Sequence, residues 1–112
     1  MQAVVETPSY LADAERLFSP EERMAIVDRL AADPRCGVVI PGSCGIRKVR
    51  FGFGARGKSG GARVIYVFSG ESLPVFALAA FAKNEKANLS AAERNALAKV
   101  VTEIVESYRR QK

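Results

Sequence analysis

Residues 46–68 constrain the possible folds of this chain more than any other stretch. Two runs rich in β-branched and aromatic residues, 46–51 and 62–68, flank a loop with glycines at positions 52, 54, 57, 60 and 61. This pattern predicts two antiparallel strands joined by a long glycine-rich connection. Side chains alternate between the faces of a strand, so Lys48 and Arg50 are expected on one face and Arg47 on the other.

The same stretch is strongly basic. No Asp or Glu falls between Cys36 and Gly70, and the whole chain carries a formal net charge of +5. Cations without nearby carboxylates repel one another, which favours a polyanionic partner such as nucleic acid. An acidic protein, a membrane surface and a solvated strand edge that resists aggregation remain alternatives. The cations of this stretch are Arg47, Lys48, Arg50, Arg56, Lys58 and Arg63.

Capping boxes, prolines and apolar runs along the chain predict the remaining elements. A first strand spans 2–6, a short helix 9–17, and a second helix begins at the capping box Ser19-Pro20-Glu21-Glu22 and ends at Asp33-Pro34. Residues 36–45 are expected to be loop, and the apolar run 74–82 a central strand covered on both faces. A second capping box opens the last helix at Ser90.

These elements predict one α+β domain over residues 1–112, in the order β-α-α-β-β-β-α. Its sheet is expected to be four-stranded and mainly antiparallel, with two N-terminal helices and one C-terminal helix. The longest apolar run is too short to cross a bilayer and the N-terminus lacks the features of a signal peptide. We therefore expect a cytoplasmic protein without a membrane partner.

Residue usage excludes several kinds of catalytic centre. The chain contains no histidine, which removes the usual triads and histidine-based ribonuclease pairs. Cys36 and Cys44 lack further soft ligands, so neither a metal nor another cofactor is expected. Two free thiols are the favoured interpretation, with a redox switch as the alternative. Phosphate chemistry performed by Lys and Arg alone remains possible, because clustered cations stabilise a developing negative charge.

Three motifs in order resemble the HigB branch of the RelE-like toxins, the toxin halves of bacterial type II toxin–antitoxin pairs. They are Gly-Ile-Arg-Lys-Val-Arg at 45–50, Gly-Lys-Ser-Gly-Gly-Ala-Arg-Val-Ile-Tyr at 57–66 and Ala-Phe-Ala-Lys-Asn-Glu-Lys at 80–86. The following Leu-Ser-Ala-Ala-Glu at 89–93 also fits the branch. The likeness covers nearly the whole chain, and the predicted order of elements matches the RelE-like fold.

The resemblance implies a metal-independent endoribonuclease, an mRNA interferase that enters the ribosomal A site and cleaves mRNA there. The 2′-hydroxyl of the substrate would act as nucleophile, and translation and growth would stop. A cognate helix-turn-helix antitoxin, similar to HigA, would cover the basic face. Carried over residue by residue, the catalytic positions are Lys48, Arg50, Arg63 and Lys83, with Arg63 at the scissile phosphate and a lysine as general base. The RNA-binding positions are Arg47, Arg56, Lys58, Asn84 and Lys86.

The sequence departs from RelE at two positions of the implied site. Ser90 stands near the place of a catalytic tyrosine, and Asn84 replaces an arginine. Tyr66 is not a substitute, because it alternates away from Arg63. The identity of the acid and base is therefore left open. A non-catalytic RNA-binding module or a decayed toxin is the alternative function, and a nuclease that ignores the ribosome is a variant of the first.

Overall fold

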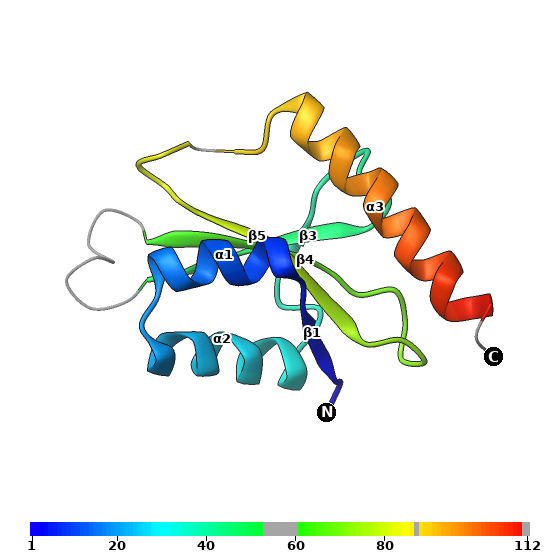
Figure 1. Ribbon diagram of the computed structural model, residues 1–112, viewed down its shortest axis with the longest axis horizontal. Coiled ribbons are helices and arrows are strands. Elements are labelled where there is room, and N and C mark those ends of the chain that lie inside the picture. Colours follow the sequence, from blue (N-terminus) through cyan, green and yellow to red (C-terminus); the bar gives the residue numbers. More distant parts are fainter. Residues whose placement is uncertain (53–60, 87, 111–112) are drawn as a thin grey trace.

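The computed structural model describes residues 1–52, 61–86 and 88–110. In these parts of the chain three helices surround one sheet with the strand order β1-β5-β4-β3-β2 (Figure 1). The elements are β1 (Val4–Glu6), α1 (Pro8–Leu17), α2 (Pro20–Ala32), β2 (Val38–Val39), β3 (Ile46–Phe51), β4 (Ala62–Val67), β5 (Val75–Ala82) and α3 (Ala91–Arg110).

The predicted α+β class is confirmed, but the sheet differs from the expected four antiparallel strands. It has five described strands, because β2 lies within the segment 36–45 that was expected to be loop. Val38 and Val39 are 67% and 45% exposed, so β2 has no buried face that an alternating pattern could reveal. The sheet is also mixed, because β1 pairs in parallel with β5 whereas the other pairs are antiparallel.

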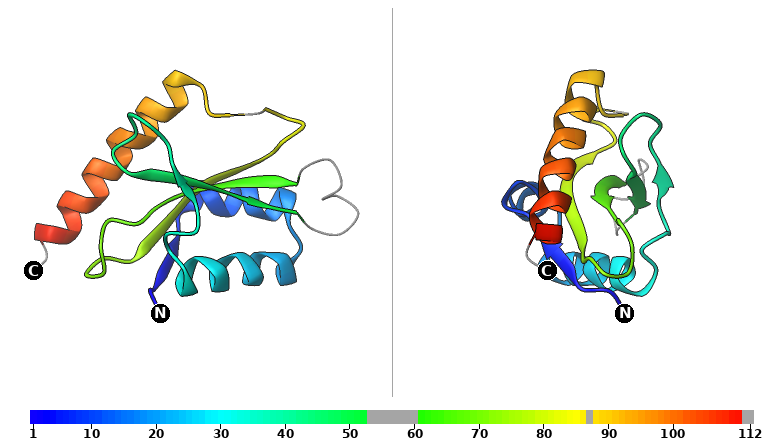
Figure 2. Two further views of the ribbon diagram at one scale, coloured as in Figure 1. Left: turned by 180° about the vertical axis from the view of Figure 1, so that it is seen from behind. Right: turned by 90° about the vertical axis from the view of Figure 1, so that its right-hand side faces the viewer.

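Two apolar cores lie on opposite faces of the sheet. Tyr10 and Leu30, from α1 and α2, pack with Tyr66 on one face. Val101 of α3 packs with Ile65 on the other, and α3 runs in a different direction from the α1–α2 pair (Figure 2). The residues of β5 are divided between the two cores, which confirms the prediction of an interior strand covered on both sides.

Helix capping explains where the first two helices begin. Thr7 and Pro8, which lie between the predicted first strand and the predicted first helix, start α1: the Thr7 hydroxyl accepts a hydrogen bond from the Tyr10 N–H at 3.3 Å. Proline at the first helical position is compatible with this role because its missing N–H has no helical partner to lose. The capping box predicted at Ser19 and Glu22 is present in full.

Helix α1 also completes the edge of β5 beyond the end of β1. The Thr7 hydroxyl donates to the Ala77 carbonyl at 2.8 Å, and the Asp13 carboxylate accepts from the Ala80 N–H at 3.0 Å. The Ala80 N–H would otherwise lie at an unpaired strand edge, whereas the Ala77 carbonyl also accepts from the Thr7 backbone N–H at 3.2 Å. A side chain therefore replaces the missing strand beside the second half of β5, the half that leads to residues 83–90.

Of the helices in the described ranges, none combines the length and hydropathy that a bilayer span requires.

Candidate functional site

The register of β3 and β4 brings together three predicted catalytic residues. Arg50 pairs directly with Arg63, and Lys48 pairs with Ile65 two positions along β4. Strand alternation places all three cations on the face occupied by the α3 core, which includes Ile65. We call Lys48, Arg50 and Arg63 the cationic face. Arg50 is exposed, whereas Lys48 and Arg63 are half-buried.

The start of α3 closes over one end of this face. The Lys48 Nζ donates a hydrogen bond to the Asn88 Oδ1 at 2.8 Å. Both side chains line a small pocket of about 130 Å³, and Arg94 in the first turns of α3 lines it too. The remaining lining side chains are apolar: Ile40, Ile65, Phe81 and Leu89.

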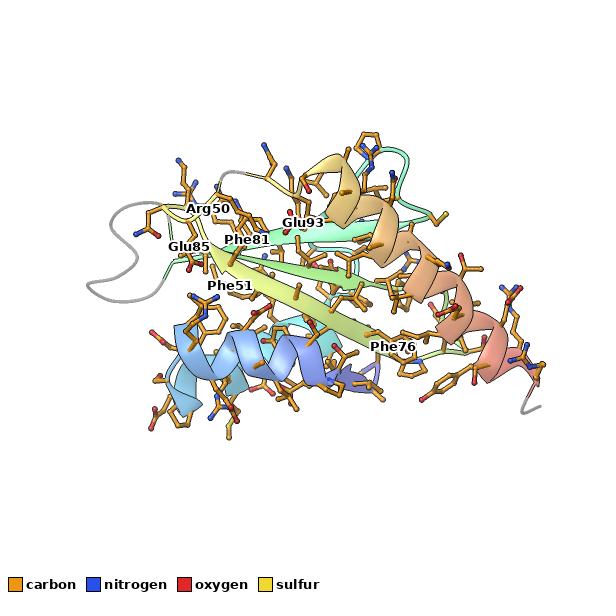
Figure 3. All side chains as sticks on the ribbon, turned by 45° about the horizontal axis from the view of Figure 1, so that its top comes forward. Arg50, Phe51, Phe76, Phe81, Glu85 and Glu93 are labelled. Atoms are coloured by element: carbon orange, nitrogen blue, oxygen red, sulfur yellow. The ribbon has the colours of Figure 1, made fainter. Side chains whose placement is uncertain are left out.

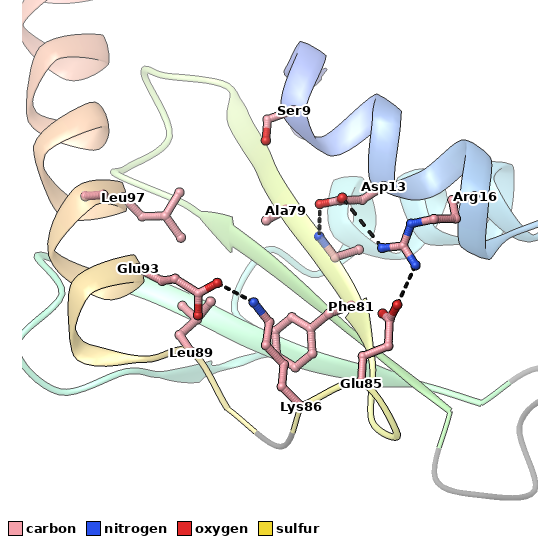
Figure 4. Close-up of a pocket in the computed structure, with 12 residues that line it drawn as sticks. Ser9, Asp13, Arg16, Ala79, Phe81, Glu85, Lys86, Leu89, Glu93 and Leu97 are labelled. Atoms are coloured by element: carbon pink, nitrogen blue, oxygen red, sulfur yellow. Dashed lines mark hydrogen bonds and ion pairs between the residues drawn. The ribbon is translucent and has the colours of Figure 1, made fainter.

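A second, larger pocket of about 510 Å³ adjoins the first between α1, the end of β5 and α3 (Figure 4). Phe81 and Leu89 line both pockets. At one side of the larger pocket Lys86 forms an ion pair with Glu93 and places its Nζ 5.0 Å from the centre of the Phe81 ring. At the other side the Arg16 guanidinium lies 2.6 Å from the Glu85 carboxylate.

Hydrogen bonds and these ion pairs together favour the charged form of the Glu85 and Glu93 carboxylates. The Ala82 backbone N–H, and then Arg16, keep the pKa of Glu85 below its usual value of 4.5. The hydrogen bond from Lys86, followed by that from the Ser90 backbone, does the same for the pKa of Glu93. Lys86, which was predicted to bind RNA, is thus paired with the Glu93 carboxylate, and its contact with RNA stays a prediction.

The other predicted site residues lie in different places. Lys83 and Asn84 are exposed in the turn after β5, where the Lys83 backbone N–H donates to the Gly61 carbonyl at 3.1 Å, next to β4. Figure 3 shows Arg50, Phe81 and Glu85 at this same end of the sheet. Arg56 and Lys58 lie outside the described residues. Their proposed contact with RNA stays a prediction.

Arg47 is the predicted RNA-binding residue that the structure separates from the others. It lies on the opposite face of β3, where its Nη1 donates to the Gly37 carbonyl at 2.7 Å and to the Arg35 carbonyl at 3.4 Å. Through these two hydrogen bonds its guanidinium stabilises the segment that leads into β2. The contact of Arg47 with RNA stays a prediction, and the observed hydrogen bonds give the side chain a structural use.

No tyrosine of this chain lies on the cationic face. Tyr10 and Tyr66 are buried in the α1–α2 core, and Tyr108 stacks edge-on against Phe76 in the α3 core. The Tyr66 hydroxyl accepts from the Gly37 N–H at 2.7 Å and donates to the Pro34 carbonyl at 2.9 Å. Burial raises the pKa of the Tyr66 phenol above its usual value of 10.0. The expectation that Tyr66 points away from Arg63 is confirmed.

Ser90 and its neighbours at the start of α3 have structural roles. The Ser90 hydroxyl accepts from the Glu93 N–H at 3.1 Å, and the Glu93 carboxylate accepts from the Ser90 N–H at 2.9 Å. This is the capping box predicted from the sequence. It fixes the direction in which α3 leaves the segment 83–90, and so fixes Arg94 against the small pocket.

Sequence reasoning missed Asn88 and Arg94 as neighbours of Lys48. Arg94 follows the capping box directly, and its place four residues after Ser90 indicates only a helix surface. Among the described residues, no three side chains of the types His, Cys, Asp or Glu gather closely enough to hold a metal ion. Taken together, the site is a group of Lys and Arg side chains on a rigid sheet, beside one helix start.

Two comparisons with known proteins agree with this geometry. The family described as the RelE toxin of the RelE/RelB toxin–antitoxin system matches residues 42–112, which contain the cationic face and the start of α3. A solved structure of the Escherichia coli toxin RelE, a mutant with two arginines replaced by alanine and in the free state, is similar with a TM-score of 0.57. The two share 18% sequence identity over 87% of this chain and 93% of that one, so the likeness is one of fold.

Proposed function

Because the chain belongs to the RelE toxin family of RelE/RelB toxin–antitoxin systems, we propose that it is an endoribonuclease toxin that cleaves mRNA in the ribosomal A site. The observation that carries this proposal is the register that sets Arg50 opposite Arg63, with Lys48 on the same face. Three cations on adjacent strands form a fixed surface for a phosphate backbone. Cleavage of translated mRNA in the cytoplasm would stop translation and growth.

The chemistry is a transfer within the substrate and needs only proton exchange from the protein. For this step the Lys48 Nζ must be in its neutral amine form: it takes the proton of the 2′-hydroxyl, and the 2′-oxygen attacks the adjacent phosphorus, so a bond from the 2′-oxygen forms. The bond from phosphorus to the 5′-oxygen then breaks, which leaves a 2′,3′-cyclic phosphate and a 5′-hydroxyl. Arg63 and Arg50 stabilise the negative charge that develops on the phosphate oxygens. Lys83 is the candidate that returns a proton to the departing 5′-oxygen.

The toxin family implies an antitoxin as partner. We assign this antitoxin to the helix-turn-helix type, similar to HigA, and the chain to the HigB branch. Support for the branch comes from the three motifs at 45–50, 57–66 and 80–86. An antitoxin that covers the cationic face would prevent contact between these residues and RNA. Its binding site on the toxin would then overlap the residues that cleave.

A non-catalytic RNA-binding protein or a decayed toxin is the second candidate. One observation favours it: all three tyrosines lie in the apolar cores, and Ser90 is engaged as a helix cap. The start of α3 thus offers Ser90, a helix cap, near the position where RelE has its catalytic tyrosine. In this alternative the cationic face still binds RNA, and cleavage is absent.

The test is induction of the toxin from a tightly regulated promoter, with primer extension on a translated and an untranslated copy of one mRNA. Growth arrest with cuts only in the translated copy would establish ribosome-dependent cleavage. Cuts in both copies would indicate a nuclease that ignores the ribosome. Folded protein that gives neither arrest nor cuts would favour the second candidate.

Two substitutions assign the roles. Arg63→Gln is expected to lower the cleavage rate by roughly 100-fold or more, the usual effect of removing one preorganised stabilising donor. Lys48→Met keeps the length of the side chain and removes the proton acceptor, so cleavage should fall while the fold is retained. A folded Lys48→Met protein that cleaves at the wild-type rate would exclude Lys48 as the base.

A further inference from the structure

The small pocket beside Lys48 contains an arginine with an unusual environment. Among the described residues, the Arg94 Nε is a buried nitrogen without a hydrogen-bond partner. A buried N–H donor that lacks an acceptor destabilises the folded protein. Arg94 is therefore held in a place where its guanidinium is only partly satisfied by the protein itself.

The charges around this pocket make the position of the Arg94 guanidinium still less favourable. Lys48 and Arg94 are both cationic and both line it, and none of the described lining residues is acidic. The neighbouring carboxylate of Glu93 lies in the larger pocket, where it pairs with Lys86. Arg94 also lies near the N-terminus of α3, where the helix dipole disfavours a cation and favours an anion.

The pocket is shaped by rigid parts of the fold. Ile65 belongs to the central strand β4 and Phe81 to β5, and both are fully buried or nearly so. The capping box of Ser90 and Glu93 sets the start of the helix that carries Arg94. Among the described lining residues, Asn88 contributes the one neutral polar side chain, and its amide oxygen accepts from Lys48 at 2.8 Å. The site thus has two cations, one amide and a hydrophobic floor.

We propose that this pocket binds a phosphate group of the RNA backbone, with Arg94 as the residue that contacts it and Asn88 as a residue that positions Lys48. This inference rests on the proposed function, because the anion is taken to be part of the substrate of the cationic face. A phosphate supplies acceptors for the Arg94 guanidinium and a counter-charge for two neighbouring cations. It also meets the positive end of α3.

Direct binding tests the inference without any cleavage. The probe is a single-stranded 2′-O-methyl RNA, which cannot be cut through its 2′-oxygen, and binding is measured by fluorescence anisotropy over a series of salt concentrations. Arg94→Gln preserves most of the side-chain volume and removes the charge. It should weaken binding about 3- to 10-fold and reduce the slope of log affinity against log salt by about 0.7, the value for one lost phosphate contact on a single strand.

Arg110→Gln is the matched control. Arg110 is exposed on the same helix, about 24 Å farther along its axis at 1.5 Å per residue. The substitution makes the same change in net charge as Arg94→Gln. Because it lies far from the pocket, it should leave affinity and salt slope at the wild-type values. Equal affinity and slope for the Arg94→Gln and Arg110→Gln proteins would overturn the inference, as would a wild-type protein that does not bind the probe.

Asn88→Asp gives a second readout. This substitution places a carboxylate beside Lys48 and Arg94 and so supplies the anion internally. We expect weaker RNA binding than in the wild type together with an unchanged or higher unfolding temperature, whereas ordinary structural damage would lower both. Undiminished RNA binding by the Asn88→Asp protein would count against the phosphate site, and Arg94→Lys should restore the wild-type salt slope because it restores the charge.

The inference and the proposed function fail in different ways. A wild-type protein that binds the probe but does not cut translated mRNA would exclude the nuclease and leave the phosphate site to be judged by the variants. If the wild type cuts translated mRNA and the Arg94→Gln protein cuts it equally fast and binds the probe equally tightly, the proposed function stands and the phosphate site is excluded.

Discussion

Arg50 and Arg63 lie directly opposite each other across β3 and β4, with both side chains on the face that α3 covers. Like charges in this arrangement destabilise a sheet, and cross-strand pairs of this kind are worth roughly 0.2–1 kcal/mol. We therefore expect repulsion between these two residues, which the register places opposite each other in the candidate site. An RNA phosphate bound between the two guanidinium groups would convert the repulsion into attraction.

Removing Arg50, the exposed member of this pair, is expected to raise stability and to lower activity. Arg50→Gln should raise the free energy of unfolding by up to about 1 kcal/mol because the repulsion is lost. Cleavage and RNA affinity should fall at the same time. Urea unfolding at low and high salt checks the cause, since ions screen the repulsion and the gain should shrink at high salt. A destabilised Arg50→Gln protein at low salt would contradict the argument.

The two tyrosines of the α1–α2 core should respond differently to loss of their hydroxyls. Tyr66→Phe leaves the buried Gly37 N–H without its acceptor and should lower the free energy of unfolding by about 1–3 kcal/mol. The Tyr10 hydroxyl is buried without a partner among the described residues, and burial raises the pKa of Tyr10 to about 12. Tyr10→Phe should therefore be neutral or stabilising. Chemical denaturation of both variants makes the comparison, and equal losses would disprove it.

The fold class and part of the candidate site can be predicted from local sequence patterns. Strand alternation alone assigns Lys48 and Arg50 to one face of their strand and turns Tyr66 away from Arg63, because the side-chain period of a strand is fixed. That Arg63 shares the face of Lys48 and Arg50 follows only from the observed register of β3 and β4. The capping boxes at Ser19 and Ser90 are equally local signals. These are the cases in which the residues near a position in sequence decide its structure.

The rest depends on contacts between distant segments. The two residues of β2 become a strand only because β3 offers them an edge, and their exposed valines leave no pattern to read. Asn88 meets Lys48 across 40 positions, a contact set by how α3 packs on the sheet. Arg47, one residue from Lys48, donates a hydrogen bond to the Gly37 carbonyl, a structural contact that the sequence did not predict. Tertiary contacts of this kind have no signature in one sequence.

Gly61, which directly precedes β4, should not tolerate a side chain. Its φ of +68° lies in the left-handed region, and an added Cβ would clash with the Phe51 carbonyl oxygen. Gly61→Ala should lower the free energy of unfolding by several kcal/mol or displace the β3–β4 pair and reduce cleavage. Gly70→Ala is the control, because Gly70 also has a positive φ of +111° but its Cβ would meet open space. Its loss should be smaller, and the reverse order in thermal unfolding would exclude the clash.

The Arg16–Glu85 ion pair ties α1 to the turn that carries Lys83, and it should make stability sensitive to acid. The pKa of Glu85 in the folded protein lies below its usual value of 4.5, first through the Ala82 N–H and then through Arg16. The stabilisation is therefore present above about pH 4.5 and is lost as the pH falls through the lower folded pKa. Glu85→Gln should unfold at a lower temperature than the wild type at pH 7 and at nearly the same temperature near pH 3. Because the Glu85 and Arg16 side chains are 43% and 51% exposed, the difference at pH 7 should be small. An equal difference at both pH values would show that packing, rather than charge, holds this turn to α1.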